Sequence, residues 1–186
     1  MKRCWIAGFV VTALLVTFVQ AAEEALKSGP QVGQTLPNSF DAVNVTGPDV
    51  GEKCCIFCEY GDMPVAMVFA REPSTEVVQL MKKLDAAAKK HGEAMRSTAI
   101  FLTDDKKVPE KLKEVAGKEK LENTIVRTFE ADGPKNYNMA KDADVTVLLF
   151  TDRVVKANHA FRKGKLQEKE IDAVVADVAK IVPAGK

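Results

Sequence analysis

Apolar and amphipathic segments alternate along the chain from residue 64 onward. Residues 64–70 (PVAMVFA) form an unbroken apolar run of strand length, which is typical of a strand buried on both faces. Ser74 or Thr75 can then cap a helix through a side-chain oxygen. The apolar residues that follow recur at helical spacing and predict a helix that ends near residue 92: Val77, Leu80, Met81, Leu84 and Ala88.

Three more strand-like runs follow this helix. We predict strands over residues 97–103, 124–129 and 144–150, with a short helix after Pro109 between the first two. Because a helical crossover brings back the chain in the same direction, the two strands that are reached through a helix, over residues 97–103 and 124–129, are expected to be parallel to the strand before them.

The last part of the chain predicts an antiparallel pair. A tight turn at Asp152-Arg153 leads into a strand over residues 154–161, and a helix over about residues 167–182 closes the chain. Parallel and antiparallel neighbours together require a mixed sheet. The pattern therefore predicts a layered α/β domain.

The first residues have the layout of a secretory signal peptide. Lys2 and Arg3 make a positive start, residues 5–19 are apolar, and small residues precede a cleavage position before Ala22. An uncleaved membrane anchor is the alternative, because the apolar run is nearly long enough to span a bilayer.

This N-terminus sets the expected domain limits. We expect residues 1–21 to be the signal peptide, residues 22–33 a polar lead-in and residues 34–183 one domain, with turns and a hairpin near its start. Export, to the periplasm or outside the cell, would place the protein where disulfides are permitted. No membrane contact is expected after cleavage.

The composition fits one globular domain and argues against nucleic acid as a partner. Of the 186 residues 46% are apolar, and 27 Lys and Arg nearly balance 26 Asp and Glu. No basic cluster with interleaved aromatic residues is present.

Cysteine spacing supplies the candidate chemistry. Cys54, Cys55 and Cys58 remain once Cys4 leaves with the signal peptide, so an odd number of thiols is left. In an extended strand, residues three apart have Cα atoms about 10 Å apart, whereas a disulfide needs less than about 7 Å. A Cys55–Cys58 bond therefore predicts a turn or helical twist at residues 56–57.

Several motifs, in this order, resemble the thioredoxin-like superfamily in its exported, peroxiredoxin-like form. They are VGQTLPNSF (residues 32–40), VAMVFA (residues 65–70), DGPKNYNM (residues 132–139) and DVTVLLFTDRVV (residues 144–155). The resemblance implies a three-layer sandwich, with a mixed sheet between helices on both faces. It also implies thiol–disulfide chemistry.

The chain departs from that family at the usual active site. Ser74 and Val77 stand where the family's two redox cysteines follow the first core strand, and Val145 stands in place of its cis-proline. A serine hydroxyl cannot exchange disulfides. The family's activity can therefore apply here only through a different pair of cysteines.

We interpret Cys55 and Cys58 as a relocated redox pair, with Cys54 as an auxiliary thiol. Lys53 could stabilise a thiolate there, while Glu59 would oppose it, and the pattern predicts no helix start nearby. The more exposed cysteine would attack, and the other would resolve the mixed disulfide. Protein thiols or disulfides would be the partners, with no cofactor and no metal.

Three alternatives remain open for the same cysteines. They could form a structural disulfide in a non-catalytic module that binds a protein, bind Cu(I) or Zn²⁺, or link two chains. Other polar residues have simpler roles: we expect Arg71 to be solvated, Tyr137 to pack in the core, and His91 and His159 to be surface or satisfied side chains.

Overall fold

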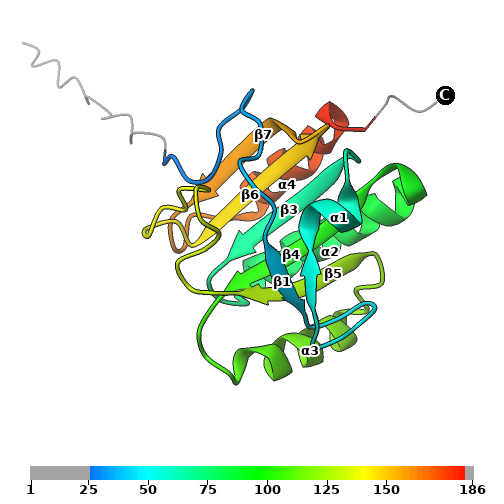
Figure 1. The fold of residues 1–186 in the computed structure, drawn as a ribbon, viewed down its shortest axis with the longest axis vertical. Helices are drawn as coiled ribbons and strands as arrows, with labels where there is room; N and C mark the ends of the chain where they lie inside the picture. Colours follow the sequence, from blue (N-terminus) through cyan, green and yellow to red (C-terminus); the bar gives the residue numbers. More distant parts are fainter. Residues whose placement is uncertain (1–25, 183–186) are drawn as a thin grey trace, which may run out of the picture.

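Residues 26–182 are described by the computed structural model, which contains one mixed seven-stranded sheet (Figure 1). The strands are β1 (Asp41–Asn44), β2 (Lys53–Cys55), β3 (Val65–Ala70), β4 (Arg96–Leu102), β5 (Thr124–Phe129), β6 (Val145–Thr151) and β7 (Val154–Phe161). Their order across the sheet is β2-β1-β5-β4-β3-β6-β7. Strands β3, β4 and β5 are parallel, and all other neighbours are antiparallel.

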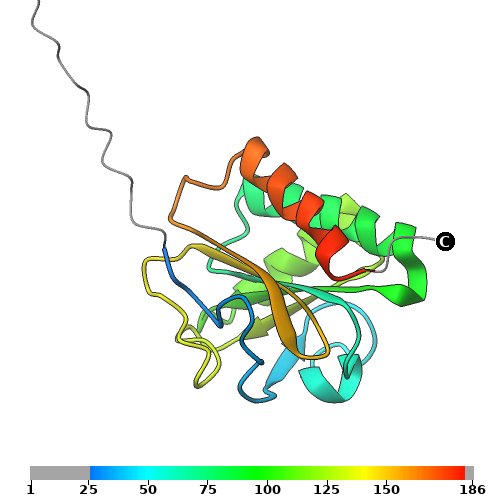
Figure 2. The same cartoon turned by 90° about the horizontal axis from the view of Figure 1, so that it is seen from above.

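Helices cover both faces of this sheet unequally. The long helices α2 (Thr75–His91), α3 (Val108–Glu119) and α4 (Glu168–Asp177) share one apolar cluster with one face. On the other face, the five-residue helix α1 (Ile56–Tyr60) packs with the segment that leads into β1. Figure 2 shows α2 and α4 above the sheet and α1 below it. The predicted α/β architecture, with a mixed sheet between helices, is confirmed.

Local sequence signals positioned most of these elements correctly. Ser74 caps α2 by accepting a hydrogen bond from the Val77 amide at 3.3 Å. Asp152 and Arg153 have φ of 52° and 60°, the left-handed conformation that a two-residue hairpin turn needs. The predicted last helix is shorter than expected, because α4 ends at Asp177 and only a 3-10 turn (Val178–Lys180) continues it.

The predicted signal peptide lies outside the described residues. Part of the predicted lead-in lies within them and packs on β6 and β7: the Ser28 hydroxyl bonds to Thr146, and the Asn158 amide donates to Pro30. Among the helices of residues 26–182, none is long and apolar enough to cross a bilayer.

Arg71 is half-buried and engaged in hydrogen bonds, whereas we expected a solvated side chain. It follows β3 and donates to the carbonyls of Ala143 at 2.9 Å, Ala131 at 3.2 Å and Ala140 at 3.2 Å. The chain between β5 and β6 thus folds around one guanidinium group. A loop rich in backbone carbonyls needs such a donor, because water reaches its half-buried interior poorly.

We predict that Arg71→Gln lowers the free energy of unfolding by about 2–4 kcal/mol, since a shorter neutral side chain cannot reach three carbonyls. Urea unfolding measures the change. As a control, Lys82→Gln removes an exposed ion pair to Glu119 and should cost at most about 1 kcal/mol. Equal losses in the two variants would contradict the role assigned to Arg71.

Candidate functional site: a disulfide at the start of helix α1

Cys55 belongs both to the end of β2 and to the start of α1. It is the last residue of the strand and the N-cap of the helix, with extended backbone angles of φ −71° and ψ 116°. The helix brings Cys58 back toward Cys55, so their Cα atoms lie 5.3 Å apart and the two residues form a disulfide. The predicted helical twist after Cys55 is confirmed. The expectation that no helix begins nearby is wrong.

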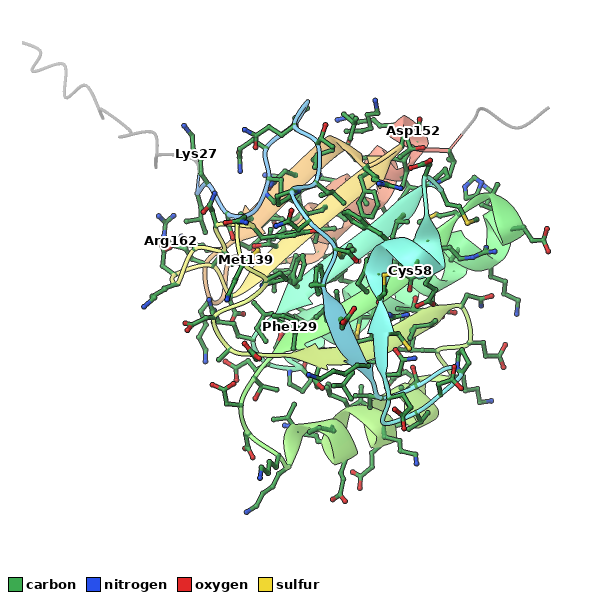
Figure 3. The ribbon with its side chains drawn as sticks, viewed as in Figure 1. Lys27, Cys58, Phe129, Met139, Asp152 and Arg162 are labelled. Carbon is green, nitrogen blue, oxygen red and sulfur yellow. A yellow bond between two sulfur atoms is a disulfide. The ribbon has the colours of Figure 1, made fainter. Side chains whose placement is uncertain are left out.

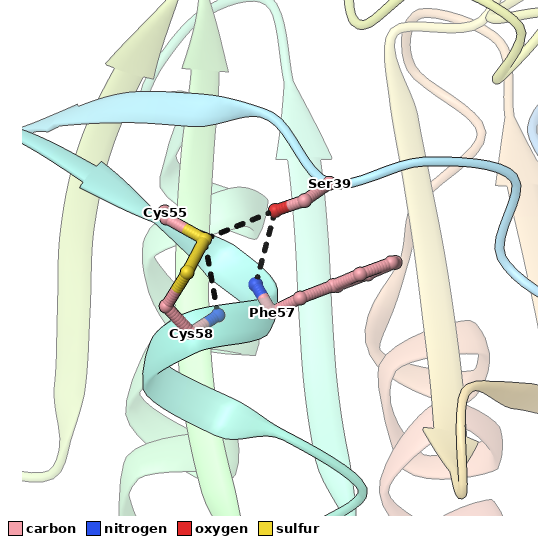
Figure 4. The surroundings of a disulfide bond; sticks show 4 residues. All are labelled: Ser39, Cys55, Phe57 and Cys58. Carbon is pink, nitrogen blue, oxygen red and sulfur yellow. Dashed lines mark hydrogen bonds between the residues drawn. A yellow bond between two sulfur atoms is a disulfide. The ribbon is translucent and has the colours of Figure 1, made fainter.

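Two hydrogen bonds converge on the Cys55 sulfur (Figure 4). The Cys58 amide donates to it at 3.1 Å, and the Ser39 hydroxyl lies 3.4 Å away. A disulfide sulfur carries no hydrogen, so the hydroxyl must be the donor. Ser39 is itself positioned by the Phe57 amide, which donates to its oxygen at 3.2 Å. The same donors would stabilise negative charge on Cys55 after reduction.

The two sulfurs differ in access. Cys58 is exposed, whereas Cys55 is half-buried between β1 and α1. Figure 3 labels Cys58 on α1, in front of the sheet, and Figure 2 shows that α1 lies on the opposite face of the sheet from α2 and α4. An incoming thiol therefore meets Cys58 first.

Cys54 stays outside the disulfide. It is half-buried, and its sulfur accepts a hydrogen bond from the Asn44 side-chain amide at 3.1 Å. Successive strand residues point to opposite faces, so β2 directs Cys54 and Cys55 apart. Cys54 is therefore a free thiol on β2, separate from the disulfide.

Of the charged residues near the disulfide, Lys53 and Glu59 were expected from the sequence, whereas Arg127 was not. Lys53 is exposed on β2. The Glu59 carboxylate, by contrast, forms an ion pair with Arg127 on β5, whose side chain is fully buried. Arg127 also donates to the Tyr60 hydroxyl at 3.1 Å, and burial raises the pKa of Tyr60 to about 12 despite the opposing guanidinium. An arginine within the apolar run TIVRTF was the available signal for this interaction.

The metal interpretation finds no formed ligand set here. Within residues 26–182, no three His, Cys, Asp or Glu side chains gather so that they could hold a metal ion. His91 is the last residue of α2, and His159 on β7 lies 3.0 Å from the Asp177 carboxylate. Neither histidine belongs to β2 or α1, the two elements that carry the cysteines.

The position at which the family usually carries its cysteines has a structural role in this chain. Ser74 is engaged as a helix cap, Val77 is fully buried, and no peptide bond between residues 26 and 182 is cis, including that of Val145. Tyr137 packs in the core as expected, and its hydroxyl donates to the Asn38 carbonyl at 3.0 Å. This edge of the sheet offers no thiol.

Solved structures share the architecture at low sequence identity. A candidate protein disulfide isomerase from Bacteroides thetaiotaomicron matches with a TM-score of 0.63 and 13% identity, over 84% of this chain and 94% of its own. Peroxidoxin BcpB from Mycobacterium tuberculosis matches with a TM-score of 0.57 and 16% identity, over 85% and 99%. The chain has the thioredoxin-like fold.

Other thioredoxin-like matches include a secreted disulfide oxidoreductase from Mycobacterium tuberculosis, with a TM-score of 0.51 and 12% identity over 74% of this chain and 94% of that one. Neither a protein-family model nor a curated protein sequence matches the chain. The similarity therefore concerns the thioredoxin-like fold, while the site must be judged from its own residues.

We predict that neither of the two tyrosines ionises at its ordinary pH in the folded protein. Burial disfavours the phenolate and raises the pKa of Tyr60 to about 12 and that of Tyr137 still further. Ultraviolet absorbance should show little phenolate at about pH 11, one unit above the ordinary value. Urea-unfolded protein should titrate normally, and Tyr60→Phe assigns the earlier step. A native transition near the ordinary pKa of 10.0 would contradict burial of that ring.

Proposed function

We propose that the protein is an exported thiol–disulfide oxidoreductase that acts on protein thiols or disulfides through Cys55 and Cys58. The observation that carries the proposal is the unequal pair itself. Cys58 is exposed to an incoming sulfur, while Cys55 has two hydrogen-bond donors ready to stabilise it as a leaving thiolate. The thioredoxin-like fold is consistent with this chemistry.

In the oxidising direction, a substrate thiolate attacks the Cys58 sulfur. A bond forms between substrate and Cys58, and the Cys55–Cys58 bond breaks with its electron pair on Cys55. A second substrate thiolate then attacks the mixed disulfide and releases Cys58. The substrate loses two electrons and two protons, and both cysteines become thiols. In the reducing direction, Cys58 attacks a substrate disulfide and Cys55 resolves the intermediate.

A purely structural disulfide would gain little at this position. The bonded residues are only three apart in sequence, so the loop that they close is very short. Chain-entropy arguments give such a loop about 2 kcal/mol of stabilisation. A domain of this size can fold through its apolar core without that contribution. The short spacing therefore favours a reversible redox pair over a structural disulfide.

Export rests on the chain's N-terminus. The positive start, the apolar run and the small residues before Ala22 are the pattern of a cleaved signal. A secreted disulfide oxidoreductase is also among the proteins that share the fold. An oxidising compartment would keep the pair in exchange with other disulfides.

We predict a reduction midpoint above about −270 mV for the Cys55–Cys58 bond, within the range of thiol–disulfide oxidoreductases. Thiol trapping across a glutathione redox series measures it. Cys54→Ala should leave the midpoint unchanged, because Cys54 lies outside the bond. A bond that stays closed below about −300 mV would identify a structural disulfide and reject the proposed function.

We also predict which cysteine forms the mixed disulfide. In Cys55→Ser, the remaining Cys58 thiol should react with oxidised glutathione at least about tenfold faster than Cys55 does in Cys58→Ser, because the attacking thiol must be accessible to reach the glutathione disulfide. Mass spectrometry of the trapped adducts, in the Cys54→Ala background, gives both rates. Faster trapping on Cys55 would reverse the assignment of the two roles.

A further inference from the structure

Arg127 is an unusual residue for the centre of a sheet. Its side chain is fully buried on β5, and its Nε and Nη1 atoms have no hydrogen-bond partner within residues 26–182. Unpaired buried donors of a charged group are unfavourable for folding. A buried ion pair is also weak support for stability, since an apolar side chain of similar size often replaces it without loss. Stability alone does not account for Arg127.

The partner of Arg127 places this charge in the redox site. Its Nη2 atom pairs with Glu59, the residue directly after Cys58. Glu59 lies on the same five-residue helix as Cys58, and Cys55 is the N-cap of that helix, so the carboxylate belongs to the immediate surroundings of both sulfurs. An uncompensated carboxylate beside the pair would disfavour a thiolate on either cysteine.

Helix α1 itself cannot fix where that carboxylate points. With five residues it is too short to be stable alone, and it docks through the buried side chains of Ile56 and Tyr60. Arg127 contacts Tyr60, the residue directly after Glu59. Its guanidinium carbon lies 5.4 Å from the centre of the Tyr60 ring, and its Nη2 atom donates a hydrogen bond to the Tyr60 hydroxyl. The Arg127 guanidinium thus orients both the Glu59 carboxylate and the Tyr60 hydroxyl.

Other charges near the cysteines do not replace Arg127. On the hairpin, Lys53 and Asp41 are exposed, and Asp41 is the cross-strand partner of Cys55. Within residues 26–182 neither of them forms an ion pair with Glu59, whereas the fully buried guanidinium of Arg127 does, and a buried charge acts at low effective dielectric. Arg127 is therefore the cation best placed to offset Glu59.

We propose that Arg127 is a positioning residue for the Cys55–Cys58 pair: it holds the Glu59 carboxylate against the sheet and cancels its charge, so that the reduced cysteines ionise readily. This inference rests on the proposed function for its significance. Arg127 touches no reacting atom and acts only through Glu59.

The test is the pH profile of alkylation of the reduced protein, in the Cys54→Ala background, for four forms: wild type, Glu59→Gln, Arg127→Met and the double variant. Arg127→Met leaves the Glu59 charge uncompensated and should slow alkylation at neutral pH about three- to tenfold. This corresponds to an upward shift of about half to one pH unit in the midpoint of the alkylation profile. Adding Glu59→Gln should restore the rate, because it removes the interfering charge.

Glu59→Gln alone provides the readout if Arg127→Met fails to fold, which circular dichroism would reveal. It leaves Arg127 uncompensated and should speed alkylation about three- to tenfold. The matched control is Glu119→Gln, which removes a carboxylate paired with Lys82 on a distant helix and should change nothing.

Two results would overturn the proposal. One is a double variant as slow as Arg127→Met, which would mean that Arg127 matters only for packing. The other is an alkylation rate in Glu59→Gln within twofold of wild type. Both readings are made on reduced protein, so they are independent of the reduction midpoint on which the proposed function depends.

Discussion

The turn from β2 into α1 is the constraint on which the rest of the site depends. One residue, Cys55, must end a strand and cap a helix at once, and only this reversal brings Cys58 within bonding distance. The reversal is held from below by Ile56 and Tyr60, which sit in the apolar cluster with β3 and β6. Access to Cys58, hydrogen bonds to Cys55 and the direction of Glu59 all follow from it.

The usual redox position and the pair described above lie on different parts of the fold. The usual position follows β3, where Ser74 caps α2 and Arg71 donates to three carbonyls of the segment between β5 and β6. The Cys55–Cys58 pair precedes β3 and lies over the face of the sheet that the long helices leave uncovered (Figure 1). In this chain the two sulfurs are therefore presented at the start of the short helix α1 rather than at the start of the long helix α2.

Features with local causes were predictable from the sequence. The strand over residues 124–129, the Ser74 cap and the turn at Asp152-Arg153 each depend on a few neighbouring residues, so a pattern of apolar, capping and turn residues was enough. Helix α1 was not predictable, because five residues show no period. Only the geometric requirement of a C-x-x-C disulfide indicated a twist there.

Contacts between distant segments were beyond sequence reasoning. The acceptors of Arg71 are at least 60 residues away along the chain, and Glu59 and Arg127 are 68 residues apart. Nothing near either arginine indicates its partner. A charged residue inside an apolar run can only be marked as unusual until the fold brings its counterpart beside it.

The way α1 is held also determines how the molecule opens. A free five-residue helix would fray within microseconds or less, yet this one can leave the sheet only by exposing Ile56 and Tyr60 to water and separating Glu59 from Arg127. Its amide hydrogens should therefore exchange with solvent in the same cooperative unit as β5, rather than with the hairpin loop. We therefore expect the shortest α-helix of residues 26–182 to open with the centre of the sheet rather than with the surface loops.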